Sequence, residues 1–145
     1  MKRSNIFSLG FLIAIFIIIL IIIINSIKTN IQLNRLSNMF KDINILEDKI
    51  SIYYLDNGTI PIKSKIEDFT NSVNPNDNNN YYEIDLEKLE NINLYYGKKN
   101  EGEKDIYIIN EMSHTIYYYK GVKYNNYNVF SKKLNYMEVE IENYH

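Results

Sequence analysis

The residue types that usually perform chemistry in proteins are scarce in this sequence of 145 residues. There is no cysteine, which excludes thiol catalysis and disulfides, and the two histidines are His114 and His145. Neither histidine has a base, a nucleophile or a metal ligand at motif spacing, and lone histidines in turns or at chain ends are usually solvated. We therefore predict no catalytic, cofactor-binding or metal-binding residue, and no enzyme.

Residues 74–80 are the stretch best able to supply the oxygen ligands that calcium requires. They read Asn-Pro-Asn-Asp-Asn-Asn-Asn, and Asp85 follows shortly after. The stretch lacks the central glycine and the terminal bidentate glutamate of an EF-hand loop. The favoured interpretation is a polar surface loop, and calcium binding is the alternative.

Charge and length narrow the classes of partner. The chain has 16 Lys and Arg against 18 Asp and Glu, a formal net charge of -2, and the basic residues are scattered. This composition provides no basic field to concentrate phosphate, so we do not expect nucleic acid as a partner. Because no catalytic constellation is found, we expect no small-molecule substrate either. The length allows one small domain beside any membrane segment.

Residues 6–24 have the length and composition of a membrane span. They contain no charge, and sixteen of the nineteen are Ile, Leu or Phe. Sixteen such residues favour partitioning into the bilayer by about 5–10 kcal/mol. Asn25 and Ser26 follow in place of the small-residue cleavage site of a secretory signal. We predict a permanent single-pass transmembrane helix over residues 6–25, with the lipid bilayer as a partner.

The flanking charges suggest an orientation. Lys2 and Arg3 precede the span, while Lys28 and Arg35 follow it at short distance. Positive residues concentrate on the cytoplasmic side, so we predict a short basic cytoplasmic end at residues 1–5 and an extracytoplasmic C-terminal domain. The expected location is the cell membrane.

The helix is predicted to continue past the bilayer over residues 26–56. No glycine or proline lies between Phe11 and Asn57, whereas Gly58 and Pro61 provide a stop signal. A stalk coiled coil could bury the apolar face of this extension, but strand signals follow directly, so we favour packing on the protein's own sheet. The residues of the predicted apolar stripe are Ile27, Ile31, Leu36, Phe40, Ile43, Leu46, Ile50 and Tyr53.

Residues 57–145 are predicted to form a small α+β unit with an antiparallel sheet. Residues 62–80 are interpreted as a polar connection, and a turn or brief helix is expected at residues 86–91. The expected strands are 81–86, 105–110, 115–120, 122–130 with an interruption at Asn125 and Asn126, and a last strand or short helix at 137–141.

Tyrosine is concentrated in this C-terminal part. Twelve of the fourteen tyrosines lie from Tyr81 onward, including the run Tyr117, Tyr118 and Tyr119. Neighbouring strand positions face opposite sides, so Tyr118 should point away from Tyr117 and Tyr119. The run is our candidate interaction surface, because exposed tyrosines suit recognition of a partner. The favoured interpretation remains ordinary strand packing.

The layout resembles that of type IV pilins and type II secretion pseudopilins. Residues 53–61, read as Tyr-Tyr-Leu-Asp-Asn-Gly-Thr-Ile-Pro, resemble the helix exit of that group, and residues 107–110 and 115–122 resemble hairpins of pilin-like proteins. The resemblance implies a structural subunit that packs through its apolar helix with other pilin-like subunits or an assembly platform. Some pseudopilins bind calcium in a sheet-domain loop.

The processing signature of that group is matched only in part. Gly10 and Phe11 after Lys2 and Arg3 form a candidate processing site, but Ile15 stands where the group has glutamate at the fifth mature position. Cleavage after Gly10 would leave fourteen apolar residues, fewer than the ~20 that span a bilayer. The competing hypothesis is therefore an uncut, membrane-anchored binding module that does not polymerise.

Overall fold

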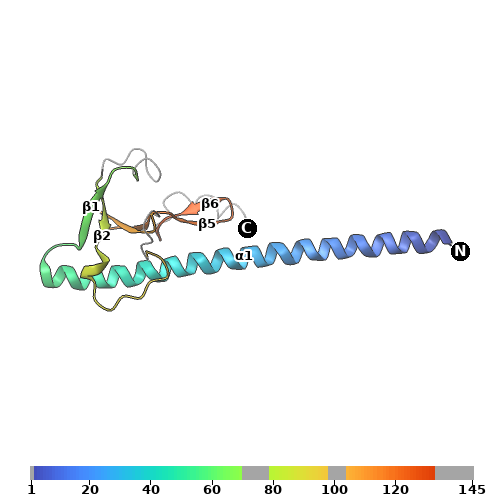
Figure 1. Ribbon diagram of the computed structural model, residues 1–145, viewed down its shortest axis with the longest axis horizontal. Coiled ribbons are helices and arrows are strands. Elements are labelled where there is room, and N and C mark those ends of the chain that lie inside the picture. The colour runs from blue at the N-terminus through green and yellow to red at the C-terminus, as the bar shows by residue number, and fades with distance from the viewer. Residues whose placement is uncertain (1, 70–78, 98–103, 133–145) are drawn as a thin grey trace.

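The computed structural model describes residues 2–69, 79–97 and 104–132, and it has an α+β layout. One long N-terminal helix is followed by a small antiparallel sheet (Figure 1). In chain order the elements are α1 (Lys2–Asn57), β1 (Ile62–Ile66), β2 (Tyr81–Ile84), the single 3₁₀ turn η1 (Leu86–Lys88), β3 (Tyr107–Asn110), β4 (Ile116–Tyr118), β5 (Val122–Tyr124) and β6 (Tyr127–Val129).

Helix α1 is continuous over 56 residues, which corresponds to about 84 Å at 1.5 Å per residue. The predicted stop is confirmed. Gly58 has a φ of +72° and donates its backbone N–H to the carbonyl of Tyr54 at 2.8 Å. Glycine adopts this left-handed conformation without steric cost, so the chain can leave the helix there.

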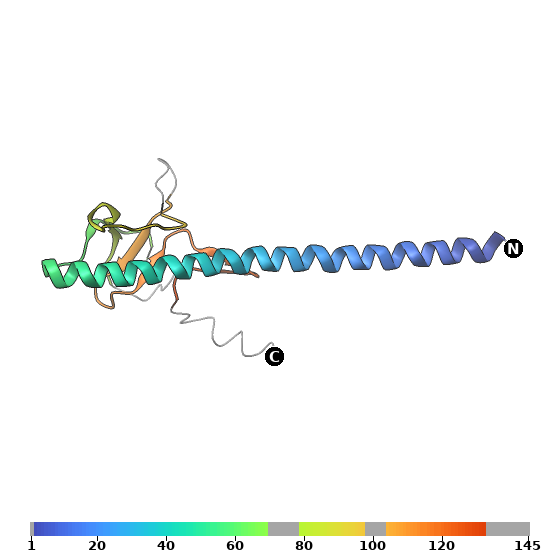
Figure 2. The ribbon, with the colours of Figure 1, turned by 90° about the horizontal axis from the view of Figure 1, so that it is seen from below.

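Only the C-terminal half of α1 is covered by the rest of the chain. We call residues 36–57 of α1 together with the strands the head; Figure 2 shows the N-terminal half of α1 extending well beyond it. Met39, Ile43, Leu46 and Ile50 are buried at helical spacing and form the core with the sheet. The predicted stripe is therefore confirmed from Leu36 to Tyr53, although it did not include Met39.

Two parts of the stripe prediction were wrong. Ile27 and Ile31 are 53% and 48% exposed, because the hydrophobic core reaches the helix only from Leu36 onward. Asp42, which is charged and is not a member of the predicted stripe, is completely buried. Its burial depends on partners that lie far along the chain and are described below.

The main sheet has the order β1-β2-β3-β4, with every neighbouring pair antiparallel. β3 and β4 confirm the predicted hairpin, and β2 and η1 confirm the strand and brief helix predicted before it. The prediction of a polar connection over residues 62–80 was wrong in its first part, because Ile62–Ile66 is an edge strand. Its exposed Lys63 and Lys65 are typical of sheet edges, where charge discourages further pairing.

The run 122–130 is a hairpin rather than one interrupted strand. β5 pairs with β6, with Val122 opposite Val129 and Tyr124 opposite Tyr127, so Asn125 and Asn126 form a two-residue turn. Asn125 has a φ of +52°, which asparagine tolerates and tight hairpins require. The element predicted at residues 137–141 lies outside the described residues.

The two faces of the main sheet carry two separate clusters. The face toward α1 joins the main core, which includes Tyr107, Ile109, Ile116 and Tyr118. The opposite face is covered by Phe69, whose ring lies 5.2 to 5.9 Å from the aromatic rings of Tyr81, Tyr117, Tyr119 and Phe130.

Candidate functional site

The apolar segment at the start of α1 is the first candidate site. The large apolar side chains from Phe11 to Ile24 are all at least 39% exposed. The most apolar 18-residue window has a mean hydropathy of 2.9 and is 0% buried. The described part of the chain thus contains one helix whose length and composition suit it to cross a membrane.

The candidate processing residues lie inside this helix. Gly10 does not interrupt α1, and Phe11 directly after it is 68% exposed. Ile15, at the position where the pilin group has glutamate, is 39% exposed. Whether the chain is cleaved between Gly10 and Phe11 stays a prediction.

The second candidate is the carboxylate of Asp42, buried inside the head where α1 packs on β3 and on the loop at residues 95–97. Tyr95 donates its backbone N–H to both carboxylate oxygens, at 2.9 and 3.0 Å. Tyr96 donates its backbone N–H at 2.9 Å, and the Tyr107 hydroxyl donates at 2.7 Å. Among the described residues, no ion pair includes Asp42. Three donor groups therefore satisfy its oxygens, and these hydrogen bonds tie the helix to residues 95–96 and to β3.

A second carboxylate holds the same loop from the other side. Asp105 accepts the backbone N–H of Gly97 at 2.9 Å and the Tyr118 hydroxyl at 2.8 Å. Gly97 has a φ of +78°, and a Cβ there would lie 2.9 Å from the Tyr107 ring. Residues 95–97 are thus held between Asp42 and Asp105. We call the two carboxylates with their donors the Asp42–Asp105 clamp.

Sequence reasoning missed this clamp. The available signal was Asp42 itself, which interrupts the buried spacing of Met39, Ile43 and Leu46 on one helix face. A charged residue inside an apolar stripe indicates a partnered buried group. With its oxygens occupied by donors from the protein, Asp42 is suited to positioning elements and not to transferring protons to a substrate.

Tyr107 and Tyr96, two tyrosines of the clamp, have raised pKa values. Burial, and then the hydrogen bond to Asp42, raise the pKa of Tyr107 well above its usual value. Burial is also the main cause that raises the pKa of Tyr96, although Arg35 opposes it. Both shifts favour the neutral phenol in the folded protein.

The raised pKa of Tyr107 predicts a loss of stability at high pH. Below about pH 10, the phenol is neutral in the folded and the unfolded chain, so its contribution to stability is fully present. Above pH 10 the unfolded chain ionises first, and the free energy of unfolding should fall by about 1.4 kcal/mol per pH unit from this residue alone. Urea titrations at several pH values should show a shallower decline for Tyr107→Phe; an unchanged slope would contradict the assignment.

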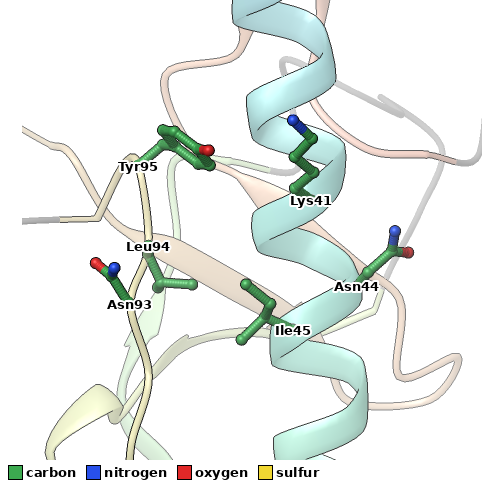
Figure 3. Close-up of a pocket in the computed structure, with 6 residues that line it drawn as sticks. All are labelled: Lys41, Asn44, Ile45, Asn93, Leu94 and Tyr95. Carbon is green, nitrogen blue, oxygen red and sulfur yellow. The ribbon is translucent and has the colours of Figure 1, made fainter.

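A shallow depression of about 580 Å³ lies between α1 and the chain segment at residues 93–95. Figure 3 shows Leu94 and Ile45 pointing toward one another across it. Lys41 and Tyr95 also line the depression, and the Lys41 ammonium lies 5.8 Å from the centre of the Tyr95 ring. Asn44 and Asn93 complete the described lining. Among these described lining residues no base is paired with a nucleophile.

Comparisons of the chain with protein-family models, curated proteins and solved structures find no match.

The tyrosine run is divided between the two clusters. Tyr118 is buried in the main core, whereas Tyr117 and Tyr119 are half-buried in the cluster around Phe69. The predicted alternation of their side chains is confirmed. The face that Tyr117 and Tyr119 share is covered by Phe69, and Tyr118 is 5% exposed, so these residues do not form one open surface.

His114 and Asp85 lie in separate parts of the head. His114 is exposed in the β3–β4 turn, with its ring 6.5 Å from that of Tyr54. Asp85 lies near Lys63 and Lys88 at 3.5 and 3.6 Å and caps η1. The described residues contain no group of three His, Cys, Asp or Glu that could hold a metal ion. His145 and most of the loop at 74–80 lie outside the described residues.

Proposed function

We propose that this chain is a structural, pilin-like or pseudopilin-like subunit, held in the cell membrane by its apolar helix and able to pack through that helix in a secretion or pilus assembly. The supporting observation is that the exposed apolar segment and the buried spine of the head are one unbroken helix. Any force on the anchor is therefore transmitted directly to the head.

The dimensions of the anchor suit a bilayer. Residues 6–24 are helical, and nineteen residues extend about 28 Å, close to the ~30 Å hydrocarbon thickness. An apolar surface of this size is unstable in water, whereas lipid chains or other apolar helices would cover it. Lys2 and Arg3 support a cytoplasmic N-terminus, with the head on the other side.

A second candidate function is a permanently anchored binding module that does not polymerise. Ile15 favours it, because the carboxylate that would pair with a neighbouring subunit's N-terminal amine is absent. The short apolar segment that cleavage would leave also favours it. The two functions differ in the N-terminus and in contacts between chains.

The mature N-terminus is the first test. Intact mass and N-terminal sequencing of the membrane-extracted protein should find Phe11, with a methylated amine, if it is processed as a pilin. Gly10→Val, which changes the residue before the cleavage point, should then leave the chain full length. Ala14→Val, a similar change elsewhere in the same helix, should still allow cleavage. An intact Met1 in the wild type would favour the anchored module.

Contacts between chains are the second test. Because the sequence has no cysteine, single cysteines introduced along residues 12–24 would report on helix packing alone. Packed helices should cross-link with a period of three to four residues, since one face of each helix is in contact. Absence of cross-links at every position would contradict packing through the helix.

A further inference from the structure

The net charge of -2 conceals a strong asymmetry along α1. All 18 Asp and Glu residues lie from Asp42 onward, and the first 41 residues contain five basic residues and no acidic one. Lys28 and Arg35 are exposed on the part of α1 between the apolar segment and the head. The part of the helix nearest the proposed membrane is therefore basic.

The β5–β6 hairpin lies beside this basic part of the helix. β5 packs on α1, and the backbone N–H of Asn125 in the hairpin turn donates to the Gln32 side chain at 3.0 Å (Figure 1). Gln32 is seven residues beyond Asn25, the first polar residue after the span, which is about 10 Å along the helix. The polar headgroup layer is roughly 5–8 Å thick, so the turn lies just outside it.

The tip of this hairpin has the composition of an interfacial surface. Lys123, Asn125, Asn126 and Asn128 are exposed, and Tyr127 is 43% exposed. No acidic residue occurs between residues 112 and 137. Tyrosine favours the headgroup level because its ring is apolar and its hydroxyl is polar, and lysine is attracted to anionic lipid.

The opposite end of the head differs in charge. The β3–β4 turn contains Glu111, and its His114 lies next to Tyr54 near the end of α1. Tyr54 is 22 residues beyond Gln32, about 33 Å farther from the span. The head is thus basic at the end nearest the span and contains acidic residues at the other.

We infer that the tip of the β5–β6 hairpin, together with Lys28 of α1, docks on anionic phospholipid headgroups and forms a second membrane contact beside the span. This inference rests on the proposed membrane anchor. Docking would fix the tilt and rotation of the head relative to the bilayer, because a helix alone leaves both undetermined. Lys123 and Lys28 provide the attraction, and tilting of the span toward the hairpin brings the exposed Tyr127 ring to headgroup depth.

Single-cysteine labelling of the full chain tests this contact, since no native cysteine interferes. A fluorophore is attached at Asn126→Cys in the hairpin turn, at Ser26→Cys next to the span, or at Met112→Cys in the distal turn. The protein is reconstituted in vesicles of phosphatidylcholine alone or mixed with phosphatidylglycerol, with a headgroup-linked quencher. Probes at residues 126 and 26 should be quenched with phosphatidylglycerol present, and the probe at residue 112 should not.

Charge variants test the chemistry. Lys123→Gln in the Asn126→Cys chain should lower the docked-to-undocked ratio about fivefold, as expected for one basic residue at an anionic surface, and Lys123→Arg should preserve it. High salt should act like Lys123→Gln, because it screens exposed charge.

The outcomes separate the docking contact from the anchor. Quenching at residue 26 without quenching at residue 126 would overturn the docking and leave the anchor intact. Absence of quenching at residue 26 would overturn the anchor itself. Equal quenching of residue 126 with and without phosphatidylglycerol would overturn recognition of anionic lipid.

Discussion

Asp42→Ala is expected to lower the free energy of unfolding of the head by about 3–5 kcal/mol. The substitution leaves the backbone N–H groups of Tyr95 and Tyr96 and the hydroxyl of Tyr107 without their acceptor in a buried site. Small domains are stable by only about 5–15 kcal/mol, so this loss would remove much of the stability. Urea titration of the full chain in mild detergent, followed by the near-ultraviolet circular dichroism of tyrosine, would measure it.

Asp48→Ala is the matched control, because Asp48 is an exposed carboxylate on the same helix. It should change the free energy of unfolding by less than about 0.5 kcal/mol. Asp42→Asn should lie between the two, since the amide keeps one acceptor oxygen but turns an NH₂ group toward the donors. Equal effects of Asp42→Ala and Asp48→Ala would disprove the role of the clamp.

Ile15→Asp is expected to weaken insertion of the helix into the bilayer by about 3–4 kcal/mol. Ile15 is the centre of residues 6–24, where a carboxylate is farthest from water. A double variant, Ile15→Asp with Ile19→Asp, should lose about 6–8 kcal/mol, which cancels most of the favourable partitioning of the span. Membrane fractionation with carbonate extraction should then find the double variant released from the membrane.

Asn34→Asp provides the control for this experiment. It introduces the same charge on the same helix, at an exposed position outside the span. Its extraction should match that of the wild type. If the double variant remained as resistant to carbonate as the wild type, residues 6–24 would not be the membrane anchor.

The Asp42–Asp105 clamp also determines the orientation of the strands relative to α1. A buried carboxylate contributes little net stability compared with well-packed apolar residues, but it accepts only one arrangement of donors. In this head the donors come from the loop at residues 95–97, from β3 and from β4, so the clamp selects one rotation and one height of the helix relative to the sheet. The apolar segment and the head share one helix, so the clamp also sets how the head is rotated relative to that segment.

The sequence alone determined the features that depend on neighbouring residues. Residues 6–24 predict an apolar helix of membrane-span length because they contain no charge and no proline, and Gly58 ends α1 because only its own backbone freedom is required. The hairpin of β3 and β4 was predictable for the same reason, since β-rich runs flank a short turn.

Tertiary structure decided what depends on distant partners. Ile62–Ile66 is a strand because β2 pairs with it, although its own lysines resemble a loop. Tyr117 and Tyr119 are covered because Phe69 reaches them from another segment. Asp42 is buried because donors more than fifty residues away meet it, and a helical periodicity cannot show whether a charge has such partners.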